Sequence, residues 1–126
     1  MGLIDLVTEE IVRVPLKAAT KLDVLKELVQ VLFDAKKIQE TGKPLDAILA
    51  REKQGSTGLE DGIAVPHAKT EGVDTLRLAI GIAPAGIDFA ALDGKPSQLF
   101  FLMLGPPGLP GPHIEALSEI ARLTRS

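Results

Sequence analysis

Two histidines, His67 and His113, are the residues whose type and position most favour chemistry in this chain. His67 directly follows the short apolar run 63–66, and His113 comes just after the Gly/Pro-rich segment 105–112. Each lies where a strand or loop gives way to another element, and functional residues concentrate at such places. Because its side chain titrates near neutral pH, a histidine can accept a phosphoryl group, shuttle a proton or bind a metal.

A histidine that carries phosphate needs one ring nitrogen held by a hydrogen bond, and nearby donors for the phosphoryl oxygens. Arg51 could supply such donors through its planar guanidinium, and it precedes a polar loop that contains Ser56 and Thr57. His113, at the expected start of a helix, suits the role of a second histidine beside the phosphate. A phosphate-carrying site is therefore one candidate, in which His113 and Arg51 would support a phosphoryl group on His67, with Ser56 and Thr57 as phosphate-binding residues.

Zinc binding is the alternative chemistry for the two histidines. With Glu60 or Glu71 they would offer three ligands, but their spacing matches no zinc motif, so we expect no metal and no cofactor. His67 could also be a hydrogen-bonded histidine at the end of a strand, and His113 an ordinary first residue of a helix.

The supporting residues also have purely structural interpretations. Arg51 could form a surface ion pair with Asp46 or Glu52, which would contribute about 0–1 kcal/mol. Ser56 and Thr57 are of types that are common in turns.

The composition is that of an ordinary globular domain and argues against several kinds of partner. The 126 residues are 45% hydrophobic, enough to bury a core as one domain over residues 1–126. The net charge of −3 and the scattered basic residues argue against a nucleic-acid partner. Tryptophan and tyrosine are absent from the sequence, so a pocket that stacks sugar rings is not expected.

The compartment is also indicated by what the sequence lacks. Without cysteine there is no disulfide framework and no thiol nucleophile. No apolar run approaches the roughly 20 residues that span a bilayer, and the first residues do not resemble a signal peptide. We expect a cytoplasmic protein without membrane insertion. The helical pattern runs almost to the last residue, so either the domain is short or a C-terminal helical element is missing.

Hydrophobic periodicity predicts a strand and two helices in the first half of the chain. Residues 11–14 alternate weakly and stop at a proline, which favours a short strand. Thr20 can cap a helix in which apolar residues recur at helical spacing over 25–33. Residues 42–44 interrupt this pattern with a glycine and a proline, and a second helix is expected over about 45–53.

The second half is predicted to be mainly strands. Strands are expected over 63–65, 76–83 and 99–104, the last as a central strand because it is continuously apolar. A turn is expected at 84–86, and a last helix from about residue 112. This order of elements predicts a mixed α/β domain in which helices cover a sheet.

Residues 51–69 resemble the active-site segment of a known protein family. They read Arg-Glu-Lys-Gln-Gly-Ser-Thr-Gly-Leu-Glu-Asp-Gly-Ile-Ala-Val-Pro-His-Ala-Lys. This is similar to the enzyme IIA domains of the fructose/mannitol family, in the bacterial phosphoenolpyruvate-dependent sugar phosphotransferase system. The resemblance continues through 86–89, 92–96, the apolar run 99–104 and the loop before His113, and so covers essentially the whole chain.

The resemblance implies a function, a fold and roles for individual residues. His67 matches the histidine that takes phosphate from the phosphocarrier protein HPr and passes it to a cysteine of a IIB domain during sugar uptake. His113 matches the second active-site histidine, and Arg51 an arginine near the phosphate. The implied fold is a three-layer α/β/α domain with a mixed sheet flanked by helices, and the implied activity is histidine phosphotransfer.

Two departures from the family pattern leave other functions open. Glu60 stands where family members usually have glycine, and members usually continue beyond the last predicted helix. We expect Glu60 to face solvent, because a carboxylate facing a phosphohistidine would be unfavourable. The alternatives are a regulatory, nitrogen-type IIA protein whose phosphorylation state controls partner proteins, and a degenerate domain that no longer takes phosphate.

Overall fold

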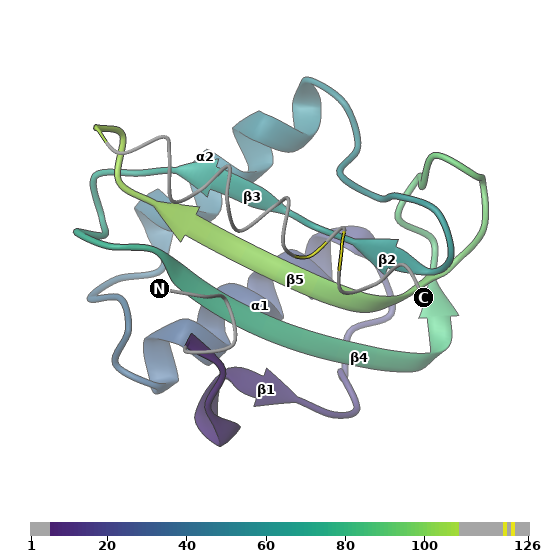
Figure 1. The fold of residues 1–126 in the computed structure, drawn as a ribbon, viewed down its shortest axis with the longest axis horizontal. Coiled ribbons are helices and arrows are strands. Elements are labelled where there is room, and N and C mark those ends of the chain that lie inside the picture. Colours follow the sequence, from purple (N-terminus) through teal and green to yellow (C-terminus); the bar gives the residue numbers. More distant parts are fainter. Residues whose placement is uncertain (1–5, 109–119, 121, 123–126) are drawn as a thin grey trace.

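A mixed sheet of five strands forms the centre of the structure (Figure 1). The computed structural model describes residues 6–108 together with Ile120 and Arg122. The sheet order is β1 (Val12–Arg13), β4 (Arg77–Ile87), β5 (Ser97–Gly105) and β2 (Ile63–Ala64), and β3 (His67–Lys69) also pairs with β5. β4 and β5 are antiparallel, whereas β1 is parallel to β4, and β2 and β3 are parallel to β5.

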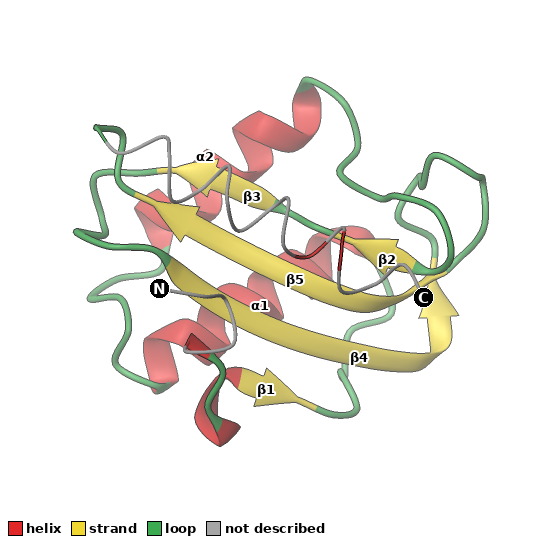
Figure 2. Cartoon of the chain, in the orientation of Figure 1, coloured by secondary structure: helices red, strands yellow, loops and turns green. Residues whose placement is uncertain are grey.

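Two helices, α1 (Lys21–Asp34) and α2 (Gly42–Lys53), pack beside each other on one side of this sheet (Figure 2). α1 follows the predicted pattern and buries one apolar face, made by Val24, Leu25, Leu28, Val29, Val31 and Leu32. The mixed α/β architecture predicted from the sequence is confirmed. The predicted last helix falls largely on residues 109–119, 121 and 123–126, which lie outside the described residues, although the described Ile120 is helical and buried.

The start of α1 is fixed by a side-chain cap, as predicted. The hydroxyl oxygen of Thr20 accepts a hydrogen bond of 3.2 Å from the backbone N–H of Asp23. This bond satisfies one of the four N–H groups that the first turn of a helix leaves without an intrahelical partner.

Thr20→Ala should therefore lower the free energy of unfolding by about 1 kcal/mol. Thr41→Ala is the matched control, because Thr41 precedes α2 but its side chain makes no capping hydrogen bond. Urea denaturation followed by circular dichroism would measure both variants. Equal losses of stability would contradict the assignment of the cap to Thr20.

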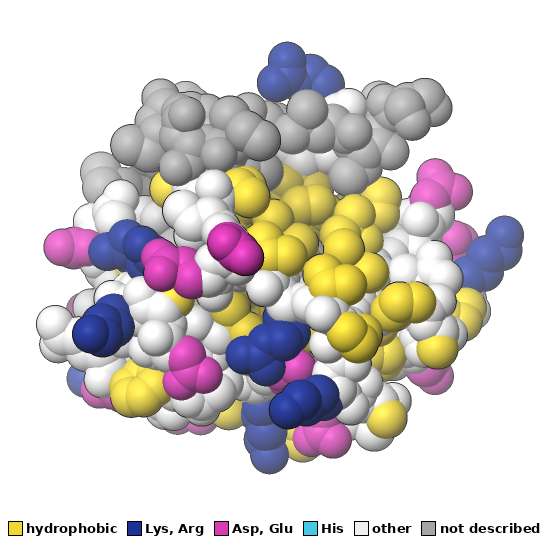
Figure 3. All heavy atoms as spheres, turned by 90° about the horizontal axis from the view of Figure 1, so that it is seen from below, with side chains coloured by type: hydrophobic (Ala, Val, Ile, Leu, Met, Phe, Trp, Pro, Cys, Tyr) yellow, Lys and Arg dark blue, Asp and Glu magenta, His cyan; other side chains and the backbone are white. Residues whose placement is uncertain are grey.

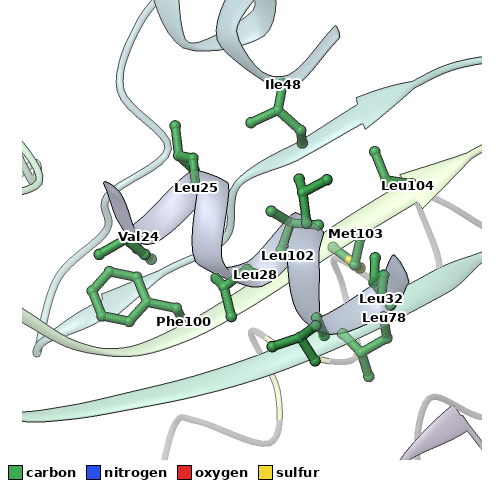
Figure 4. Close-up of a cluster of buried hydrophobic side chains, with 14 of the residues drawn as sticks. Val24, Leu25, Leu28, Leu32, Ile48, Leu78, Phe100, Leu102, Met103 and Leu104 are labelled. Carbon is green, nitrogen blue, oxygen red and sulfur yellow. The ribbon is translucent and has the colours of Figure 1, made fainter. Parts of the chain in front are cut away.

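One part of the core lies between the helices and the sheet (Figure 4), whereas the buried Leu78 and Met103 belong to the opposite face of the sheet. Figure 4 shows side chains of α1 and α2 meeting those of β5, with Phe100 and Leu102 among them. Gly81 of β4 leaves room for this packing, because a Cβ atom there would lie 2.8 Å from Leu16 and 2.9 Å from Leu28. A side chain at position 81 would therefore require the methyl groups of Leu16 and Leu28 to shift.

The prediction is wrong at two prolines. α2 begins at Gly42, three residues before the predicted start, with Pro44 in its first turn. Proline is tolerated there because the N–H group it lacks would have no intrahelical partner. The predicted turn at 84–86 is instead part of β4, which accommodates Pro84 at an irregularity in its pairing with β5.

The first strand is shorter than the predicted 11–14, because a 3₁₀ turn occupies Glu9–Ile11 and leaves β1 only two residues. β1 lies at one edge of the sheet, opposite the edge formed by β2 and β3. Figure 3 views the β1 edge and shows hydrophobic side chains gathered on it. Val14, just after β1, is 56% exposed.

Within the described part of the chain, no helix combines the length and apolar character required to cross a membrane.

Candidate functional site

His67 is the first residue of β3 and lies on the sheet edge that β2 and β3 share. The two strands keep one register along β5, since Ala64 pairs with Phe100 and His67 with Met103. They are in effect one strand interrupted at Pro66, which has no N–H group to donate. Pro66 still contributes to the ladder through its carbonyl, which accepts from Met103 N at 2.9 Å.

The register also places His67 on the sheet face opposite α1. Side chains alternate between faces along a strand, and paired residues share a face. Gly81 faces Leu28 of α1, and its partner Phe100 therefore lies on the α1 face. Met103 is three residues further along β5, so it lies on the opposite face. His67 pairs with Met103 and shares that opposite face. The imidazole is only partly buried, so it lies at the surface of this face.

The imidazole is oriented by a hydrogen bond of 2.7 Å between Nδ1 of His67 and the carbonyl oxygen of Val65. A carbonyl can only accept, so Nδ1 must carry the hydrogen in this arrangement. The neutral ring then has its lone pair on Nε2. The structure thus contains the tautomer-fixing hydrogen bond that a phosphate-carrying histidine requires.

Arg51 lies in the last turn of α2, the helix that packs against β3. Its Nη1 donates to the carbonyl of Gly55 at 2.8 Å, across the turn that follows the helix. Arg51 is only partly buried. The loop that begins at this turn leads through β2 to His67.

The hydroxyls of Ser56 and Thr57 both donate to groups of the protein. Ser56 Oγ donates to the carbonyl of Phe89 at 2.7 Å and accepts from Gly58 N at 3.0 Å. Thr57 Oγ1 donates to the carboxylate of Glu52. Both residues are therefore built into the packing of the loop.

Sequence reasoning missed the centre of this loop network, which is an ion pair between Glu52 and Lys21. Lys21 Nζ lies 2.8 Å from Glu52 Oε1, and the Glu52 side chain is only 6% exposed. Its ion-pair partner is thus a lysine of α1 rather than the neighbouring Arg51. The only sequence signal was the Arg-Glu pair at the start of the motif, and spacing along one chain cannot reveal a partner on another helix.

Glu60 is exposed, as expected from the sequence, and its backbone does not adopt the positive φ that would favour glycine. The positive φ falls on the next residue, Asp61, at 60°. Asp61 N donates to Asp93 Oδ2 at 3.1 Å, and Lys95 N donates to Asp93 Oδ1 at 3.0 Å. These backbone donors, Lys95 first, lower the pKa of the Asp93 carboxyl from its ordinary value.

His113 lies outside the described residues, so its predicted place beside His67 stays a prediction. Over residues 6–108, Ile120 and Arg122, no three His, Cys, Asp or Glu side chains are grouped so that they could hold a metal ion.

Comparison with known proteins relates the chain to bacterial proteins of two kinds. It is 37% identical over 98% of its length to the fructose-specific EIIABC component of Bacillus subtilis, and it spans only 19% of that protein. It is 36% identical over 99% of its length to a nitrogen regulatory protein of Bradyrhizobium diazoefficiens, and it spans 81% of that protein.

Solved structures show the same fold. Nitrogen regulatory protein IIA-Ntr of Neisseria meningitidis superposes with a TM-score of 0.88 at 30% identity, over 96% of this chain and 83% of that one. The complex of enzyme IIAMTL with phosphorylated enzyme IIBMTL of Escherichia coli gives a TM-score of 0.80 at 20% identity, over 95% and 82% of the two chains. Residues 5–126 match the family described as phosphoenolpyruvate-dependent sugar phosphotransferase system, EIIA 2. The chain belongs to this family.

Proposed function

We propose that the protein is a phosphocarrier that accepts a phosphoryl group on Nε2 of His67 and passes it on to a second protein. The observation that carries this proposal is the hydrogen bond between His67 Nδ1 and the Val65 carbonyl, which directs the lone pair to Nε2. Family membership supports the reaction class, because members of the EIIA family belong to a phosphotransferase system.

In the proposed step the Nε2 lone pair attacks the phosphorus of a phosphohistidine on the donor protein. The new N–P bond forms on His67 as the N–P bond of the donor breaks, and the donor imidazole keeps the electron pair. The His67 ring then carries both the Nδ1 hydrogen and the phosphoryl group, so positive charge develops on it. The Val65 carbonyl dipole, 2.7 Å from Nδ1, stabilises that charge.

We propose an HPr-type phosphocarrier as the donor and a IIB domain of a sugar permease as the acceptor. The fructose-specific relative supports the sugar branch. The complex of a similarly folded IIA protein with phosphorylated IIB supports a IIB acceptor. The proposal also places the protein in the cytoplasm and requires neither a metal nor a cofactor, because the phosphoryl group moves directly between protein side chains.

A regulatory role is the second candidate, because two nitrogen regulatory proteins are similar over nearly the whole chain. In this role the same phosphohistidine would form, but the phosphorylated and unphosphorylated forms would differ in the proteins they bind. The two candidates therefore share the donor step and differ in the acceptor.

A phosphorelay assay tests both steps. The protein would be mixed with phosphoenolpyruvate, enzyme I and HPr, its intact mass recorded, and a fructose-type IIB domain then added. We expect an acid-labile gain of one phosphoryl group that is lost to IIB. Gain of phosphate without transfer to IIB would favour the regulatory candidate, and no gain with an active relay would overturn the proposal.

Arg51 is proposed to stabilise the phosphoryl oxygens, with His113 supporting the phosphohistidine. Arg51→Ala should slow phosphorylation by about a hundredfold, since removal of one such donor has an effect of this size. Lys53→Ala removes a neighbouring exposed cation at the same end of α2 and serves as the control. Rates would be followed by intact mass under single-turnover conditions, and equal rates in the two variants would exclude this role for Arg51.

Ser56 and Thr57 are not given phosphate-binding roles, because their hydroxyl hydrogens are donated to Phe89 and Glu52.

A further inference from the structure

Glu52 is a buried carboxylate that the proposed phosphotransfer step does not use. It accepts hydrogen bonds from Thr57 N at 3.2 Å and from the Thr57 hydroxyl, and it pairs with Lys21 Nζ at 2.8 Å. Both oxygens are therefore engaged, and the side chain is 6% exposed. A carboxylate taken out of water in this way requires its partners to stay in place.

Lys21 fixes the other side of this carboxylate. Its ammonium lies 4.6 Å from the centre of the Phe89 ring and 3.4 Å from Ser56 Oγ, and it belongs to the first turn of α1. Glu52 is in the last turn of α2. The ion pair therefore ties the ends of two helices to residue 57 of the loop.

Two consecutive hydrogen bonds connect Thr57 to the imidazole. The carbonyl of Thr57 accepts from Val65 N at 3.0 Å, and the carbonyl of Val65 accepts from His67 Nδ1 at 2.7 Å. Val65 is thus held on one side by Thr57 and orients His67 on the other. The N–H and the C=O groups of Val65 belong to the same residue. A shift of Thr57 would therefore move the Val65 carbonyl, which is the acceptor of the imidazole hydrogen bond.

Residue 57 has little freedom to move independently of Glu52. The neighbouring Gly58 packs so closely that a Cβ atom on it would lie 2.8 Å from Ala91 Cα. Ser56, on the other side, is bonded to the Phe89 carbonyl. Contacts therefore hold the residues on both sides of Thr57, and Thr57 itself donates both its N–H and its hydroxyl to Glu52.

Net stability alone gives little reason for a charged pair here. Replacement of a buried ion pair by well-packed apolar residues is often neutral or even stabilising, so burial of charge adds little net stability. The hydrogen bonds of a buried carboxylate do hold its partners in place, because leaving a buried charged group without a hydrogen-bond partner costs free energy. The pair therefore has a better explanation in what it positions.

We propose that Glu52, held by Lys21, is a positioning residue for His67, which acts through Thr57 and Val65 to keep the imidazole in the Nδ1–H tautomer. The consequence for phosphotransfer rests on the proposed function, whereas the effect on the tautomer does not. The structure offers a matched control in Glu27, another carboxylate that binds backbone N–H groups. Glu27 is 12% exposed, accepts from the backbone N–H groups of Lys17 and Ala18, and pairs with Arg13 at the β1 edge of the sheet.

The test compares wild type, Glu52→Gln, Glu27→Gln and Thr57→Val by ¹⁵N NMR of the histidine ring nitrogens, at a pH where the imidazole is neutral. Thr57→Val removes only the hydroxyl and provides a second variant if Glu52→Gln folds poorly. Thermal unfolding of all four proteins reports stability. Single-turnover phosphorylation by phospho-HPr reports the rate.

We expect His67 to lose its strong preference for the Nδ1–H tautomer in Glu52→Gln and, in part, in Thr57→Val. Phosphorylation of Glu52→Gln should slow by roughly ten- to a hundredfold, the size of effect that a small misplacement of a reacting group produces. Glu27→Gln should lose stability while keeping the wild-type ring signals and rate. If the His67 signals of Glu52→Gln and Thr57→Val match those of wild type, the positioning role is refuted. If wild type takes no phosphate, the proposed function fails, and the tautomer comparison still decides the role of Glu52.

Discussion

His67→Ala should abolish phosphorylation of the protein by the phosphoenolpyruvate relay. The reason is chemical, because the variant has no nitrogen at the position where Nε2 carries the lone pair, and alanine cannot accept a phosphoryl group. The fold should persist, since the imidazole is only partly buried and its described hydrogen bond leads to a backbone carbonyl two residues away. Intact mass spectrometry after incubation with the relay would measure the loss.

His113→Ala is the informative companion to this variant. It keeps His67, so it should still gain one phosphoryl group, but more slowly, in line with the supporting role expected for the second histidine. Circular dichroism of both variants would confirm that they are folded. A phosphoryl group on His67→Ala, stable to base and labile to acid, would contradict the assignment of the acceptor.

Phe100→Ala should cause the largest loss of stability among the variants considered, about 3–5 kcal/mol. Phe100 is fully buried in β5, and its ring centre lies 5.4 Å from that of Phe89. The substitution leaves a cavity in the core that α1 and the sheet share (Figure 4). It also removes support from Phe89, over whose ring Lys21 is placed.

The neighbouring Phe101 offers a matched control, because it belongs to the same strand but points to the opposite face and is only partly buried. Phe101→Ala should therefore cost clearly less stability. The midpoints of urea denaturation would compare the two variants. Equal losses would mean that the core is not concentrated on the α1 face of the sheet.

Much of the fold could be predicted because the local signals are unambiguous. The helical spacing of apolar residues in α1 and the Thr20 cap gave its start and its buried face, and the apolar run in β5 indicated a central strand. Two of the errors arise where a proline has two possible effects. Pro44 lies in the first turn of α2 and does not interrupt the helix, and Pro84 lies in an irregular part of β4 rather than in a turn.

The site was predictable to the extent that its residues are neighbours in sequence. His67, Arg51 and the loop between them occur in one motif of nineteen residues, positions 51–69, which can be compared directly with a family. The Lys21–Glu52 pair joins residues 31 positions apart on different helices, so no local pattern indicates it. The roles of Ser56 and Thr57 depend in the same way on partners that only folding brings near.

The most direct test of the proposed function is ¹⁵N NMR of the histidine ring nitrogens in protein phosphorylated by phospho-HPr. The hydrogen bond from Nδ1 to the Val65 carbonyl predicts a single phosphohistidine, at His67, with phosphorus on Nε2 and hydrogen on Nδ1. Phosphorus on Nδ1 of His67, on His113, or on neither histidine in the presence of an active donor would contradict the account.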